Sequence, residues 1–140
     1  MKIEGDFIMT EDLNIEDDLI VKGNIYGKNG IRYNITAGNI DAGNIDAGNI
    51  TARDITAWNI NAKDITAWNI TAGNIDAGNI TALDIDAWDI NALNINARDI
   101  NYFAVCFAYK NINCKSIKGR RVNYKHFVLD GEIKTKENEE

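Results

Sequence analysis

The chain has 140 residues, of which 45% are hydrophobic and none is proline, and it carries a net charge of −6. This length fits one domain, and no apolar stretch approaches the ~18 residues that a membrane-spanning helix needs. The amino-terminal segment is acidic, unlike the positively charged start of a secretory signal peptide, so we expect a cytoplasmic protein without membrane contact.

Residues 1–34 show a six-residue period. Large apolar residues stand at Phe7, Leu13, Leu19, Ile25 and Ile31. Asp, Asn or Gly precedes each of them, and a second inward position follows two residues later, at Met9, Ile15, Val21, Gly27 and Tyr33. Such alternation is typical of short strands with one buried side. We expect these residues to form the first, less regular coils of a repeating β structure.

Residues 35–102 repeat every five residues as Ile-x-Ala-x-Asn/Asp, with isoleucines from Ile35 to Ile100. The period excludes an amphipathic helix, because five steps of about 100° move each isoleucine well off the stripe of the one before. In an extended chain, Ile and the Ala two positions later face one side, and the residue between them faces outward. An odd period then requires one corner per repeat. We place it at the Asn/Asp, because these residues tolerate left-handed conformations and hydrogen-bond nearby backbone.

Repeats with one corner each wind the chain into a narrow coil, and four of them, twenty residues, close a square turn. Read as Ile-(Asp/Thr/Asn)-Ala-x-x, the pattern resembles the bacterial pentapeptide repeat family with the large and small interior positions exchanged. The resemblance implies an all-β fold, a single-stranded quadrilateral β-solenoid or pentapeptide-repeat-like β-helix. Its core would be a ladder of side chains in which each coil contacts only its neighbours.

Residues 103–133 are expected to form irregular carboxyl-terminal coils. After Ile100, large residues resume two positions late, at Phe107, Ile112, Ile117, Val122 and Phe127. The insertion, at residues 101–107, predicts a bulge or a change of coil shape.

The end of the chain should terminate the ladder, because an uncovered strand edge recruits other chains. The residues expected to form a cap or a homodimer contact are Phe127, Val128, Leu129 and Ile133. Cys106 and Cys114 are expected to be buried thiols. Residues 134–140 read as a disordered charged tail.

A twenty-residue coil would place outward residues that are twenty apart on one side. The two acidic sets on neighbouring sides would be Asp41, Asp64 and Asp84, and Asp46, Asp86 and Asp89. Trp68 and Trp88 would stack on adjacent coils beside the second set, with Trp58 on the opposite side. We interpret this Trp pair rimmed by Asp as a binding surface. The alternative is that Asp serves corners and solubility while Trp fills a tolerant outward position.

Charge changes sign along the chain. The net charge is −3 before residue 36, −6 over residues 36–101 and +3 from residue 102 onward. A basic patch near the carboxyl terminus consists of Lys115, Lys118, Arg120 and Arg121. It could contact anionic partners, although such clusters are commonly solvated surface, and direct nucleic-acid binding is not expected.

No constellation of residues predicts catalysis, a cofactor or a metal site. The sequence has no phosphate loop, no Cys/His cluster and a single histidine, His126, interpreted as a solvated residue of the basic patch. Asp is too sparse for a calcium-binding solenoid. The six-residue period is similar to that of hexapeptide-repeat acyltransferases, but no histidine precedes His126 and their glycine spacing is absent. We expect a protein that is not an enzyme.

Two functions fit these observations. The first is a non-enzymatic interaction protein with a protein partner. The family resemblance implies a DNA-mimic-like inhibitor of a nucleic-acid-handling enzyme, and a twenty-residue coil would give one net charge per roughly 2.7 Å against about 1.7 Å in duplex DNA. The second is a structural scaffold or dimerising spacer rod without an inhibitory role.

Overall fold

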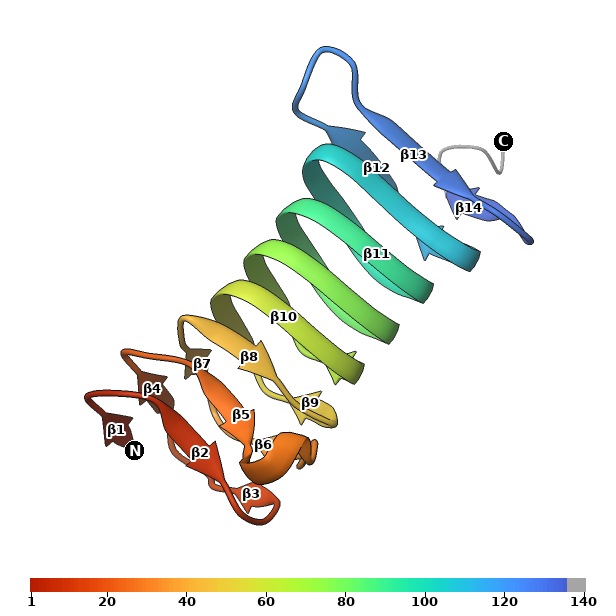
Figure 1. The fold of residues 1–140 in the computed structure, drawn as a ribbon. Coiled ribbons are helices and arrows are strands. Elements are labelled where there is room, and N and C mark those ends of the chain that lie inside the picture. Colours follow the sequence, from red (N-terminus) through yellow and green to blue (C-terminus); the bar gives the residue numbers. More distant parts are fainter. Residues whose placement is uncertain (136–140) are drawn as a thin grey trace.

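The computed structural model describes residues 1–135, whose strands wind into a rod of stacked parallel coils (Figure 1). Strands dominate the described chain, which confirms the predicted all-β solenoid. The one helical element among these residues is the short 3-10 turn η1 (Lys28–Gly30). The described part of the chain therefore has no helix with the length and apolar character needed to cross a membrane.

The solenoid begins with short strands and continues with two long ones. The opening strands are β1 (Lys2–Ile3), β2 (Phe7–Met9), β3 (Leu13–Asn14), β4 (Leu19–Val21), β5 (Ile25–Gly27), β6 (Ile35–Thr36), β7 (Ile40–Asp41), β8 (Asn44–Asp46) and β9 (Asn49–Thr51). The later strands are β10 (Asp54–Thr66), β11 (Asn69–Cys114), β12 (Ser116–Gly119), β13 (Lys125–Val128) and β14 (Ile133–Thr135). Because β11 pairs with β10 on one side and with β12, β13 and β14 on the other, it follows the chain around several coils.

Each regular coil contains three pentads rather than four. Ile55 lies beside Ile40 on one neighbouring coil and beside Ile70 on the other, so the register is fifteen residues. The same interval relates β9 to β6 and to β10. The predicted quadrilateral coil of twenty residues is therefore wrong for the pentad region. A coil there has three sides, one for each pentad.

The two ends of the rod keep this arrangement with longer coils. Phe7 pairs with Ile25, eighteen residues further on, which is three of the six-residue repeats. The turn η1 lengthens the next coil, in which Leu13 pairs with Ile35, 22 residues further on. Toward the carboxyl terminus the intervals are 17, 20 and 21 residues, at the pairings of β11 with β12, β13 and β14.

Some residues expected inside these irregular coils lie outside. Ile31, Val122 and Phe127 are 51%, 95% and 46% exposed. The insertion after Ile100 shifts the alternation by one residue, so that Cys106 is completely buried while its neighbour Phe107 is partly exposed. The rings of Phe107 and Phe127 contact each other at the surface, with centroids 4.9 Å apart and planes tilted by 50°.

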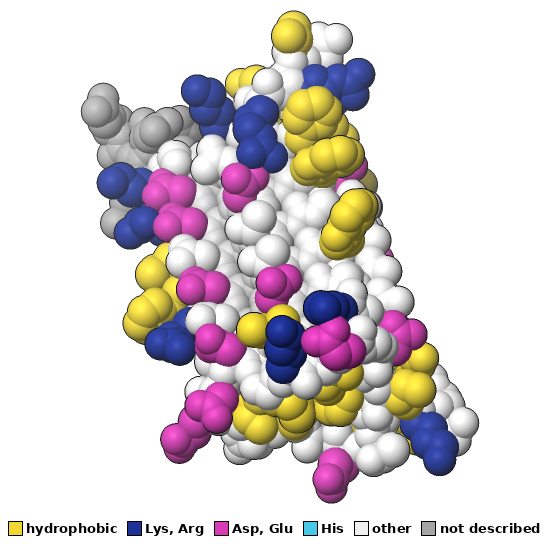
Figure 2. All heavy atoms as spheres, turned by 90° about the vertical axis from the view of Figure 1, so that its left-hand side faces the viewer, with side chains coloured by type: hydrophobic (Ala, Val, Ile, Leu, Met, Phe, Trp, Pro, Cys, Tyr) yellow, Lys and Arg dark blue, Asp and Glu magenta, His cyan; other side chains and the backbone are white. Residues whose placement is uncertain are grey.

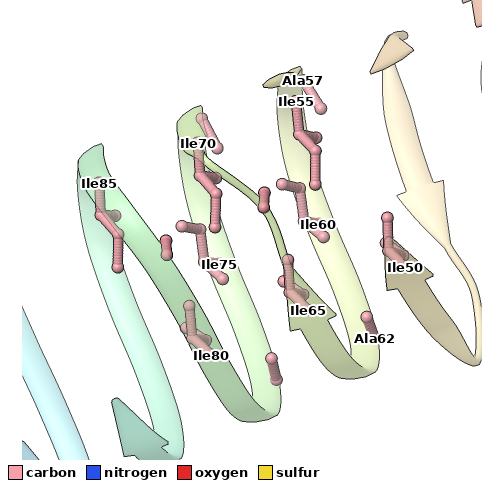
Figure 3. Close-up of a cluster of buried hydrophobic side chains, with 14 of the residues drawn as sticks. Ile50, Ile55, Ala57, Ile60, Ala62, Ile65, Ile70, Ile75, Ile80 and Ile85 are labelled. Carbon is pink, nitrogen blue, oxygen red and sulfur yellow. The ribbon is translucent and has the colours of Figure 1, made fainter. Parts of the chain in front are cut away.

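Isoleucine side chains fill the regular part of the rod. Every isoleucine of the pentads is at most 1% exposed, and every alanine is at most 9% exposed. Figure 3 shows Ile55, Ile70 and Ile85 in register on successive coils. Burial of one such side chain stabilises the fold by about 1.5–3 kcal/mol. The ladder thus gives the outward side chains a regular and rigid frame.

The Asn and Asp positions connect coils instead of forming left-handed corners. Within residues 1–135, Asn29 is the one non-glycine residue with a positive φ, at 57°. Asn59 Nδ2 donates to Asn44 Oδ1 (2.7 Å), and Asn74 Nδ2 donates to Asn59 Oδ1 (2.9 Å). Our prediction of left-handed corners is therefore wrong. An amide can donate to one neighbouring coil and accept from the other, whereas a carboxylate only accepts, which explains why Asn is more frequent at these positions.

The last coils bury a tyrosine where earlier coils bury alanine. Tyr102 is completely buried, and its hydroxyl lies 2.7 Å from Nδ1 of His126. Tyr124 adds a ring whose centroid lies 6.0 Å from that of Tyr102. Burial lowers the pKa of His126 below its ordinary 6.5. The imidazole is a partly buried partner of Tyr102 and not the solvated basic residue that we predicted.

Two further expectations concern this end of the chain. Cys106 and Cys114 are both buried, as expected, and burial raises the pKa of Cys106 to about 12. The predicted tail begins too early, because Lys134 and Thr135 belong to β14. The rest of that tail, residues 136–140, lies outside the described residues.

The lowered pKa of His126 predicts a dependence of stability on pH. The unfolded chain binds this proton more readily than the folded chain, so the contribution of His126 is present above about pH 6.5 and is lost as pH falls through the lowered pKa. We expect the free energy of unfolding to decrease from about pH 6.5 to pH 5, above the range where most carboxylates titrate, and to decrease less in His126→Gln. Urea denaturation at several pH values measures the difference. Equal slopes in both proteins would exclude His126 as the source.

Candidate functional site

The fifteen-residue coil places the three tryptophans differently from our prediction. The pairing of Asp54 with Asn69 brings Arg53 beside Trp68. The pairing of Ala57 with Ala72 brings Trp58 beside Gly73. Trp88 follows Gly73 after another fifteen residues and lines the same groove as Trp58. Trp58 and Trp88 therefore share one side of the rod, and the predicted stack of Trp68 on Trp88 is not formed.

Trp58, Trp88 and Phe103 form an exposed aromatic column along this side. Their side chains are 78%, 63% and 45% exposed. Trp88 and Phe103 lie on adjacent coils with ring centroids 6.0 Å apart and planes tilted by 39°. Trp58 stands two coils away from Trp88, with Gly73 on the coil between them. The backbones beneath are held in register by the β ladder, so the column is presented without a flexible loop.

An open groove of about 550 Å³ separates the two indoles of the column. Gly73 contributes no side chain between Trp58 and Trp88, and alanines flank it. Threonine hydroxyls and asparagine amides stand along the groove, and Asp41 contributes a carboxylate. The site therefore combines two apolar walls with polar groups along its length, as small binding sites commonly do.

Trp68 lies on another side of the rod. Its neighbours on adjacent coils are Arg53 and Leu83, whose backbone N–H donates to the Trp68 carbonyl oxygen (2.9 Å). Trp68 is 60% exposed and Leu83 is 46% exposed. This smaller apolar surface has no glycine gap.

Neither of the two acidic sets that we predicted lies on a single side of the rod. Within the first predicted set, Asp41 pairs with Thr56 and Asp64 pairs with Asn49, on different pentads of the coil. Within the second set, Asp46 pairs with Asn61, away from Asp86 and Asp89. On the side drawn in Figure 2, Asp and Glu are scattered among neutral and basic side chains and form no continuous stripe.

Several of these carboxylates are neutralised locally. Arg98 contacts Asp84 through Nη2 (2.9 Å) and Asp99 through Nε (3.0 Å). A hydrogen bond from Ser116 Oγ (2.6 Å), together with Arg98, lowers the pKa of Asp99. Two other pairs join Arg32 to Asp46 (2.8 Å) and Arg120 to Asp86 (2.7 Å). Asp89 accepts a hydrogen bond from the backbone N–H of Val105 (3.1 Å).

The predicted basic patch is divided by these contacts. Arg120 extends from the last coils to Asp86 and to the carbonyl oxygen of Ala87 (3.3 Å). Lys118 pairs with Asn101 in the strand register and is exposed, and so are Lys115 and Arg121. The four residues therefore do not act as one free cationic surface, because Arg120 is already paired.

Our reading of the sequence missed Phe103 and Gly73 as parts of the candidate site. A signal for both exists in the sequence, since Gly43, Trp58, Gly73, Trp88 and Phe103 are separated by fifteen residues each. Read with a twenty-residue coil, these residues fall on different sides, and the alternation of glycine with aromatic residues is lost.

Within residues 1–135, no three His, Cys, Asp or Glu side chains gather in a way that could hold a metal ion. A comparison of the chain with known protein families, curated proteins and solved structures found no match.

Proposed function

We propose that this chain is a non-enzymatic interaction protein that binds a protein partner through the aromatic column of Trp58, Trp88 and Phe103. The observation that carries the proposal is the exposure of three aromatic rings in register on a rigid β frame. Exposed apolar patches on regular surfaces commonly mark binding sites, and tryptophan is enriched among the residues that dominate binding energy.

The column is large enough to anchor an interface. Complete burial of an aromatic side chain removes about 150–250 Å² from water, so the exposed parts of these three rings supply about a third to a half of the ~800 Å² that each partner contributes to a standard interface. Little ordering of the backbone is needed on binding, because the β ladder already fixes the column.

A DNA-mimic-like inhibitor has less support than an interaction protein that binds through the aromatic column. With fifteen residues per coil, residues 36–101 span about four and a half coils, so their six net negative charges give one per roughly 3.5 Å, against about 1.7 Å in duplex DNA. Four of the nine acidic residues in this segment form ion pairs, namely Asp46, Asp84, Asp86 and Asp99. The rest are distributed around three sides.

A dimerising spacer rod is the second candidate. Phe127 and Leu129, which we expected at a cap or a dimer contact, are 46% and 65% exposed, whereas Val128 and Ile133 are partly buried against the core. In this alternative the exposed pair, and not the aromatic column, would carry the contact.

Recovery of partners by immobilised protein, with matched variants, tests the proposal. We expect the double variant Trp88→Ser/Phe103→Ser to lose the partner that the wild type retains, with a reduction of at least tenfold, because hot-spot aromatic residues contribute about 2 kcal/mol or more each. Trp68→Ser, on another side of the rod, is the control. Circular dichroism verifies that each variant is folded.

Two other outcomes would favour the alternatives. The DNA mimic would be favoured if the double variant still retained the partner, while salt and the triple variant Asp54→Asn/Asp64→Asn/Asp76→Asn each abolished retention. A mimic depends on summed charge. A concentration-dependent dimer in sedimentation that Phe127→Ser/Leu129→Ser dissociates, with no partner retained, would favour the spacer rod.

A further inference from the structure

We propose that the groove between Trp58 and Trp88, called here the tryptophan groove, binds an arginine side chain from a basic segment of the partner. This inference rests on the proposed function and specifies the chemistry of the partner at one place on the aromatic column. It is carried by the spacing of the two indoles, by an unpaired carboxylate at the groove and by the shape of the groove floor.

The spacing suits a cation held between two aromatic rings. Trp58 and Trp88 stand on coils separated by two intervals of about 4.8 Å, so a group midway between them is about 5 Å from each coil. Attraction between a cation and an aromatic face extends to about 6 Å from the ring centroid and is strongest for tryptophan. One planar cation can therefore contact both indoles.

The charges around the groove favour a cation. Asp41 lines the groove, no Lys or Arg does so, and Asp41 takes part in none of the ion pairs formed within residues 1–135. Lys22 lines a smaller hollow beyond Trp58 together with Asp41 and is paired with Glu4 (2.6 Å). Asp86, on the same side of the rod, is already bound by Arg120.

The floor and edges of the groove match a flat group with several donors. A Cβ on Gly73 would lie 2.5 Å from the carbonyl oxygen of Trp58, and the absence of a side chain there keeps the floor of the groove low. Thr56, Thr71 and Asp41 offer oxygen acceptors along one edge. Arginine presents five N–H donors on a planar group that stacks on aromatic faces, whereas the compact ammonium of lysine is more strongly hydrated.

Titration with an amide-capped Gly-Arg-Gly peptide, followed by NMR, tests this assignment. The chain contains three tryptophans, so three indole N–H signals report separately. We expect the signals of Trp58 and Trp88 to shift on titration while that of Trp68 stays in place. The peptide with citrulline in place of arginine has nearly the same shape without the charge and is expected to cause little shift.

Variants then identify the groups that hold the peptide. Trp58→Leu and Trp88→Leu should each lower the affinity for the arginine peptide about two- to fivefold, because one aromatic face is lost at an exposed site. Asp41→Asn should lower this affinity to a similar extent and should make peptide binding less dependent on salt. Trp68→Leu should leave it unchanged. All these positions face outward, so the fold is expected to persist.

The absence of any shift would overturn the assignment, and so would three other outcomes. They are equal shifts with arginine and citrulline peptides, equal shifts of all three indole signals, and a response of Trp58 and Trp88 to a neutral disaccharide but not to arginine, which would indicate a sugar site. Failure here is distinct from failure of the proposed function. A titration without any shift, combined with loss of the partner in Trp88→Ser/Phe103→Ser, would reject the arginine site and retain partner binding through the aromatic column.

Discussion

Replacing Ile65 by aspartate is expected to disrupt the middle of the rod. Ile65 is 1% exposed and lies between Ile50 and Ile80 on the neighbouring coils. A carboxylate there would be buried without a partner in a core that is no wider than a single coil. We therefore expect the free energy of unfolding to fall by about 4 kcal/mol or more. Chemical denaturation followed by circular dichroism measures the change.

The adjacent residue provides the control. Thr66 is exposed on the outer side of the same strand, so Thr66→Asp introduces the same charge into water and should alter stability by less than about 0.5 kcal/mol. Equal effects at the two positions would contradict the inward and outward assignment of the pentad.

The second large effect is expected at Tyr102. Among residues 1–135 it has the largest completely buried side chain, and it joins β11 to His126 in β13. Tyr102→Ala would leave a cavity and should cost about 3–5 kcal/mol, as truncation of a buried aromatic side chain usually does. Because each coil contacts only its neighbours, we expect the loss of hydrogen-exchange protection to be concentrated in β12, β13 and β14.

Tyr102→Phe separates packing from hydrogen bonding at this position. It keeps the ring and removes the hydroxyl that contacts Nδ1 of His126, so the expected loss is only about 1–2 kcal/mol. Uniform loss of protection along the whole rod in Tyr102→Ala would show that the coils unfold as one unit and would contradict the local effect proposed here.

The functional proposal and the arginine site depend on where side chains meet across coils. Trp58 and Trp88 are thirty residues apart in sequence, yet they border one groove because two fifteen-residue coils separate them. Trp68 is closer to Trp58 in sequence and lies on another side. The distinction between a site and a control residue thus follows from the register.

The repeat by itself determined which atoms are inside. An isoleucine and an alanine on one side of an extended segment, with a polar residue between them, can be buried in only one way, and the structure buries them so. The odd period likewise required a corner in each repeat, since an uninterrupted strand would turn every second isoleucine outward.

Only the tertiary structure decided how many repeats close a coil. A single pentad supplies one corner, but the corner angle depends on how isoleucines from the sides of the coil fill the interior and on how neighbouring coils pair.

The role of the Asn amides was likewise decided by the tertiary structure. Their local chemistry suggested left-handed turns, whereas stacking offered partners fifteen residues away, as between Asn59 and Asn44. The number of residues per coil decides which outward side chains become neighbours. With three sides per coil instead of four, Trp88 shares a side with Trp58 and not with Trp68.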